Sequence, residues 1–243
     1  MEIFIRIPFD RPTERRGLFA VVGGDLKESV RFLRKDKPIF IRVVALLAVF
    51  NFVLSAVMIV GIPVMVVSVL GMGDLHLGIA QGALGLGGLA GGLLSGVFSE
   101  KLKLRSTYLI LAVCSLTAAV MGVALLPFVS AFLGYLLICA AGFIAMATAT
   151  MFTVQLCAAI QRQTPPCLIG KIMAFVLMIA NCASPLGQAL YGLLFDALSE
   201  MPFVILFAAS AVGILIALLS KKTFVRLDRE ESPPPAHAET PCE

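Results

Sequence analysis

Charged residues are scarce in this chain: they make up 14% of its 243 residues, whereas soluble domains carry about a quarter. Hydrophobic residues make up 59%. This balance excludes an ordinary soluble domain and predicts an integral membrane protein. The net charge of +4 is small and comes from the connecting segments, so it does not indicate nucleic-acid binding. We therefore expect the lipid bilayer as a partner and no nucleic acid.

The residues that usually carry catalysis or bind metals are also few. Histidine occurs only at His76 and His237, far apart in the chain. Nothing resembles a Ser/His pair, a carboxylate dyad or a metal cluster. Four of the six cysteines fall within apolar stretches, and no pair has metal-site spacing, so we interpret them as small apolar side chains. We predict a protein that is not an enzyme, with no catalytic residue, bound metal or cofactor.

Six long apolar stretches are present instead, at 39–70, 77–98, 107–126, 131–160, 169–195 and 203–220. A helix needs about 20 apolar residues to cross a hydrocarbon core of about 30 Å. The stretches therefore predict an all-α membrane protein with six transmembrane helices. The first and fourth are longer than necessary, so we expect tilt, a protruding end or a kink, with Pro63 as the kink of the first.

Lysine and arginine are absent from every second connection between these stretches. All 19 lie in the alternate segments or at their edges, with Arg42 and Lys171 just inside the adjoining spans. Basic loops resist translocation, so this pattern predicts that both termini are cytoplasmic in a multi-pass protein of the cell (inner or plasma) membrane.

The chain is then divided into a cytoplasmic lead-in (1–38), a transmembrane bundle (39–220) and a disordered cytoplasmic tail (221–243). Within the lead-in, residues 24–34 carry a stripe of Leu26, Val30 and Leu33. The stripe predicts an amphipathic helix on the membrane surface, or a solvated helix packed on loops.

No Asp, Glu, Lys, Arg or His lies near the middle of any span, so a proton-coupling residue would have to come from another part of the system. Neutral polar groups remain. Because amides facing lipid are costly, these groups should form interhelical hydrogen bonds or line a substrate pathway. The pathway candidates are Asn51, Ser55, Gln81, Thr150, Thr153, Asn181, Ser184, Gln188 and Tyr191, of which the last four form one stripe. An apolar pathway with such groups suits small amphipathic compounds.

Proline and glycine mark two further features of the spans. Pro185 and Gly187 should weaken the fifth span and permit a bend, which makes it a candidate gate element. In the second span, Gly88, Gly92 and Gly96 are spaced by four and share one face. Small residues at this spacing predict close packing against another helix.

The connection at 96–105 resembles the signature loop Gly-x-x-x-Asp-Arg-x-Gly-Arg-Arg of the major facilitator superfamily (MFS) of transporters. Glu100 and Lys101 stand where the superfamily has Asp and Arg, Lys103 replaces the turn glycine, and Arg105 ends the run. The resemblance implies that Gly96, Glu100, Lys101 and Arg105 form a gating loop.

Two later segments resemble one branch of that superfamily. Residues 161–172 resemble the Gln-x-x-x-Pro…Gly-Arg-Val loop of the branch that contains enterobactin exporters and macrolide efflux proteins. Residues 181–187, with the following Gly192 and Asp196, resemble the penultimate helix of that branch. The resemblance covers nearly the whole chain and corresponds to the C-terminal six-helix half of such a transporter.

That half is built as a 3+3 inverted repeat, and the substrate pathway lies between it and an N-terminal half. The resemblance therefore implies efflux of a small-molecule substrate by alternating access, with an N-terminal six-helix half or a second subunit as partner. Residues 3–8 resemble the end of a sixth helix entering the central cytoplasmic loop, so we expect the preceding half to be missing. The alternative is a non-transporting truncated fragment, or a six-helix membrane scaffold that pairs with another subunit.

Overall fold

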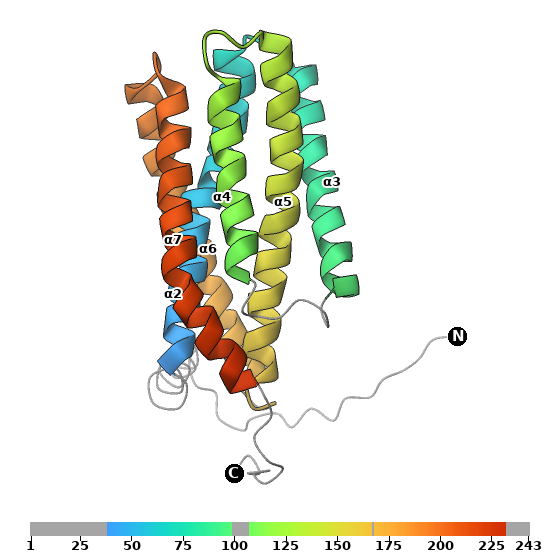
Figure 1. Cartoon of the computed structure of the whole chain (residues 1–243), viewed down its shortest axis with the longest axis vertical. Coiled ribbons are helices and arrows are strands. Elements are labelled where there is room, and N and C mark those ends of the chain that lie inside the picture. Colours follow the sequence, from blue (N-terminus) through green and yellow to red (C-terminus); the bar gives the residue numbers. More distant parts are fainter. Residues whose placement is uncertain (1–37, 99–106, 167, 232–243) are drawn as a thin grey trace, which may run out of the picture.

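A computed structural model describes residues 38–98, 107–166 and 168–231, and within these ranges the chain is a helical bundle without strands (Figure 1). Six helices in the described ranges are long and apolar enough to span a membrane. The helices are α2 (Pro38–Phe50), continued by the π-helical segments η1 (Asn51–Ser55), η2 (Val57–Gly61) and η3 (Val64–Val69), then α3 (Asp74–Phe98), α4 (Thr107–Ala124), α5 (Ala131–Arg162), α6 (Ile169–Ala197) and α7 (Pro202–Glu231). The predicted fold class is confirmed.

The first span leaves regular α-helical geometry at Asn51. The amide of Ala56 donates to the carbonyl of Asn51, and the amide of Leu70 donates to the carbonyl of Met65 at 2.9 Å. These bonds span five residues, and each wider turn advances less along the axis per residue than an α-helical turn. The π-helical segments therefore help to fit an overlong apolar stretch into the bundle. They begin well before Pro63, so proline is not what starts them.

The helix contacts repeat in the two halves of the bundle. The first three spans are α2 with its π-helical extension, α3 and α4, and the second three are α5, α6 and α7. The second helix of each set packs on the first helix of the other, α3 on α5 and α6 on α2 and η1. The third helices, α4 and α7, pack on each other. This reciprocal pattern is the one expected of an inverted repeat.

Glycine allows the closest of these contacts, but not at the predicted positions. A Cβ atom at Gly87 would overlap the carbonyl oxygen of Phe143, and one at Gly91 would overlap that of Ala147. At Gly92 and Gly96 a Cβ atom would meet no atom within 4 Å. The closest contact of α3 with α5 therefore lies one residue away from the predicted glycine face, because α3 turns Gly87 and Gly91 toward α5.

Two buried clusters fill the bundle along its length. One surrounds Phe152, whose ring contacts those of Phe50 and Phe224, and the other surrounds Met65 and Leu206. The clusters place large side chains on both sides of the middle of the bundle. They hold the first span, which contributes to both, in the centre.

Helix α7 extends beyond the predicted end of the last span. It continues to Glu231, so residues 221–231 are helical and the predicted disordered tail was wrong in its first part. The Nζ atom of Lys221 lies 5.4 Å from the ring centroid of Tyr108, a cation–π contact that joins α7 to α4. Residues 232–243 and the predicted amphipathic helix at 24–34 lie outside the described residues.

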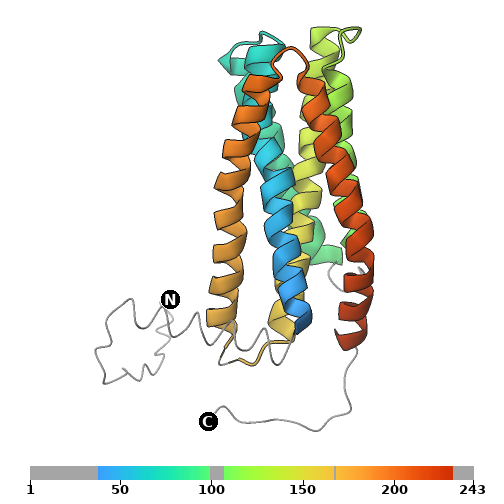
Figure 2. The same cartoon turned by 90° about the vertical axis from the view of Figure 1, so that its left-hand side faces the viewer.

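The start of α2 and the end of α7 lie at the same end of the bundle (Figure 2). The charge pattern predicts that this end is cytoplasmic. We expect Phe128→Cys, in the opposite α4–α5 connection and otherwise lacking cysteine, to react with a membrane-impermeant maleimide in intact cells. A matched chain that keeps only Cys242 should react only after permeabilisation. The reverse labelling pattern would contradict the predicted orientation.

Candidate substrate cavity

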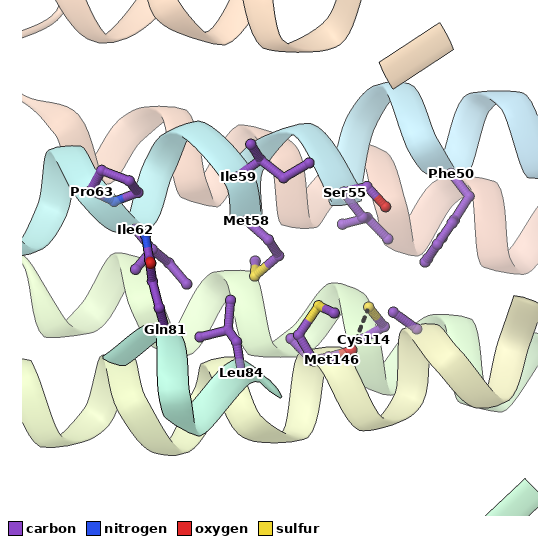
Figure 3. Close-up of a pocket in the computed structure, with 13 residues that line it drawn as sticks. Phe50, Ser55, Met58, Ile59, Ile62, Pro63, Gln81, Leu84, Cys114 and Met146 are labelled. Atoms are coloured by element: carbon purple, nitrogen blue, oxygen red, sulfur yellow. Dashed lines mark hydrogen bonds between the residues drawn. The ribbon is translucent and has the colours of Figure 1, made fainter. Parts of the chain in front are cut away.

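A cavity of about 320 Å³ lies between the first span and helices α3, α4 and α5 (Figure 3). Among the residues that the structure describes, no charged side chain lines it. Its wall is mostly apolar and is formed by Phe50, Leu54, Ser55, Met58, Ile59, Ile62, Pro63, Gln81, Leu84, Cys114, Ala145, Met146 and Ala149. Such a wall favours an uncharged ligand, because a charge moved into it would lose its hydration without gaining a partner.

Two of the predicted pathway residues, Ser55 and Gln81, line this cavity, and Pro63 adjoins them. Within the described part of the chain, neither the Ser55 hydroxyl nor the Gln81 amide makes a hydrogen bond. Ser55 is half-buried and Gln81 is exposed, so both side chains are free to bond to a ligand in the cavity.

Three other candidates bond within their own helices. The Nδ2 atom of Asn51 donates to the carbonyl of Leu47 at 2.9 Å. The hydroxyls of Thr150 and Thr153 donate to carbonyls four residues earlier, at 2.8 and 3.0 Å. These bonds satisfy the side chains locally. Whether these three residues line a substrate pathway remains a prediction.

The polar stripe of α6 lies away from this cavity. The Nε2 atom of Gln188 donates to the Oγ atom of Ser184 at 3.0 Å, Asn181 is exposed, and Tyr191 is buried. The structure thus separates this stripe from Ser55 and Gln81. Whether it faces a pathway remains a prediction.

Gly187 lies at a close contact between α6 and the first span. A Cβ atom there would overlap the carbonyl oxygen of Phe52 and lie 2.8 Å from the Cβ atom of Ala56. The residue therefore lets α6 approach η1 closely, as Gly87 and Gly91 let α3 approach α5. Pro185 lies inside a continuous α6. The expected bend at Pro185 and Gly187 remains a prediction.

Sequence reasoning missed the sulfur atoms of the cavity wall. Met58, Cys114 and Met146 come from three different spans, and their side chains are drawn around the same space in Figure 3. The Sγ atom of Cys114 lies 3.7 Å from the carbonyl oxygen of Ala145, to which it donates a weak hydrogen bond. A search for polar groups could not find these residues, because only the rotation of each helix brings them together.

A family model described as transmembrane secretion effector matches residues 12–242, nearly the whole chain. The chain belongs to this family. Its membership of the major facilitator superfamily, predicted from the loop and helix motifs, is thereby confirmed, and the chain is a multi-pass transport protein. No curated protein and no solved structure matches it. The narrower resemblance to enterobactin exporters and macrolide efflux proteins remains a prediction.

A second cavity of about 540 Å³ lies at the opposite end of the bundle from the start of α2. It lies where the first span and α6 end and α7 begins, and its wall includes Ser68, Asp196, Ser199 and Glu200. At the same end of the bundle, the Tyr135 hydroxyl donates to the His76 carbonyl at 3.0 Å, and the two rings meet edge to face. This pair joins the start of α3 to the start of α5.

The predicted gating loop can be followed only at its first residue. Gly96 lies near the end of α3 and is exposed, whereas Glu100, Lys101 and Arg105 lie outside the described residues. In the parts of the chain that the structure describes, no three His, Cys, Asp or Glu side chains lie close enough to hold a metal ion.

Proposed function

We propose that this chain is one half of an exporter that moves small amphipathic compounds out of the cell by alternating access. The observation that carries the proposal is the uncharged cavity with two free polar groups, found in a chain of the secretion effector family. An apolar wall binds the apolar part of such a compound, and the Ser55 hydroxyl and the Gln81 amide orient its polar part.

A second six-helix unit completes the transporter. Helices α3 and α6 are the least buried of the six spans. In the most apolar segment of each, only 17% of the residues are buried, against 39–50% in the other four spans. Both helices expose an amide, Gln81 in α3 and Asn181 in α6. An amide in hydrocarbon costs free energy, so a protein or aqueous surface should cover these helices. This supports an N-terminal six-helix half or a second subunit as the partner.

The source of energy lies outside the described spans of this half. None of the six carries a charged side chain near its middle, and His76 and Asp196 lie at helix ends. If export is coupled to protons, the titrating residue belongs to the second unit. The chain then contributes the wall of the cavity, and the partner contributes the coupling.

Transport by two separately encoded halves gives a direct test. We expect an efflux-deficient host preloaded with Nile red, a neutral amphipathic dye, to lose the dye faster only when this chain is expressed with an N-terminal half from the same family. Either half alone is the control, because alternating access needs both walls of the pathway. Dye loss is followed by whole-cell fluorescence.

The remaining outcomes separate the alternatives. Stable insertion of both halves without dye export would favour a membrane scaffold or a non-transporting fragment. Export by this chain alone would contradict the need for a different second unit. Export of enterobactin or a macrolide by the paired halves would support the narrower branch.

A further inference from the structure

One end of the cavity is built from a phenyl ring, sulfur atoms and the Ser55 hydroxyl (Figure 3). The Phe50, Met58 and Cys114 side chains are buried, and Met146 is half-buried beside them. Thioether sulfur is polarisable and makes favourable contacts with aromatic rings, and the flexible methionine side chain adapts to ligands of different shape. This end of the cavity therefore suits an aromatic ring better than a branched aliphatic chain.

The other end of the cavity carries the amide. In Figure 3, Gln81 lies beside Ile62 near Pro63, away from Phe50 and Cys114. Its amide makes no hydrogen bond within the residues that the structure describes, and it offers both a donor and an acceptor. A ligand whose ring lies between the sulfur atoms can therefore place one polar group against Gln81.

The volume of the cavity and its uncharged wall limit the kind of ligand that it can bind. A volume of about 320 Å³ is at the lower end of the range for small-molecule pockets, so the cavity holds one compact molecule. Because no charged side chain lines the wall, an ammonium or carboxylate group would be desolvated without a partner. Cations and anions are thus disfavoured.

We propose that this cavity binds neutral aromatic compounds, about the size of two fused rings, that carry one hydrogen-bonding group held by Gln81. The proposal deepens the proposed function and rests on it only for the statement that such compounds are exported. Binding itself requires only the cavity.

Protection of Cys114 tests the proposal on the full chain in lipid nanodiscs. The other five cysteines are replaced, and methyl methanethiosulfonate labels the remaining thiol. We expect 2-naphthol at about nine times its Kd to slow this labelling about tenfold, because the ligand occupies the cavity beside the thiol. The cation trimethylphenylammonium should not slow it. A matched chain that keeps only the exposed Cys182 should react at the same rate with and without 2-naphthol.

Two variants locate the binding. Gln81→Leu should weaken 2-naphthol about two- to tenfold and leave naphthalene unchanged, because only the hydroxyl loses a hydrogen bond. Asn181→Leu, which removes an exposed amide outside the cavity, is the matched control and should change neither. Ala149→Leu, which fills the wall near Met146, should abolish protection by both compounds.

The proposal is overturned if 2-naphthol fails to protect Cys114, if the cation protects equally, or if Gln81→Leu leaves the preference for the hydroxyl intact. These results are independent of export. Protection without export by the paired halves would leave the ligand assignment standing and remove the proposed function. Export without protection would leave the proposed function standing and remove the ligand assignment.

Discussion

Replacing Gly87 and Gly91 together by alanine is expected to lower the free energy of unfolding by about 3 kcal/mol, a shift of about a hundredfold in the folding equilibrium. Each new methyl group would overlap a backbone carbonyl of α5, at Phe143 and Ala147. A backbone atom cannot rotate away as a side chain can, so α3 must move off α5. Unfolding of the purified protein in mixed micelles, with increasing dodecyl sulfate, measures the change.

The neighbouring glycines supply the control. A Cβ atom at Gly92 would meet no atom within 4 Å, and one at Gly88 would make only an ordinary contact with the Thr150 hydroxyl at 3.7 Å. Alanine at these two positions should leave stability unchanged or raise it, since alanine is the better helix former by up to about 1 kcal/mol. Equal losses in the two double variants would show that α3 does not pack through Gly87 and Gly91.

Alanine at Gly187 should have the second large effect, lowering both stability and export. Its methyl group would overlap the Phe52 carbonyl and crowd the Ala56 methyl group, so α6 must separate from η1. Overpacking of this kind costs about 1–3 kcal/mol. The separation would also disturb the first span, whose side chains form one wall of the cavity. We expect dye export by the paired halves to fall with the dodecyl sulfate midpoint.

Two variants on the same helix distinguish packing from bending. Gly192→Ala, at a position where a Cβ atom meets nothing within 4 Å, should be neutral. Pro185→Ala restores a backbone donor on an exposed face and should leave stability unchanged or higher. If Pro185→Ala were as damaging as Gly187→Ala, the proline would be needed for the structure, and close packing at Gly187 would not explain the loss.

The sequence identified the polar residues of the spans but could not predict which of them line the cavity. Ser55 and Gln81 were predicted to line a pathway and do line the cavity, whereas Thr150 and Thr153 bond to carbonyls of their own helix. All four are polar residues in apolar spans. What separates them is whether a carbonyl of the same helix accepts from the side chain, which depends on rotamer and helix rotation.

The sequence also did not predict where the first span departs from α-helical geometry. Its apolar stretch is longer than a helix needs to cross the bilayer, and Pro63 was the predicted place for a kink. The structure absorbs part of the surplus in π-helical turns that begin at Asn51. Sequence rules place breaks at proline because its missing donor is a local property. The choice between α- and π-helical turns instead reflects packing against several neighbours.

The number of spans, the fold class and the superfamily could be predicted from the sequence alone, because apolar length and loop motifs are read along the chain and do not depend on how the helices meet. The segregation of all 19 basic residues predicts the orientation for the same reason. Tertiary structure alone decided that Gly87 and Gly91 make the close contact, and that Met58, Cys114 and Met146 share a cavity. Each residue turns a helix by about 100°, so a shift of one position selects a different face, and only packing determines which face is buried.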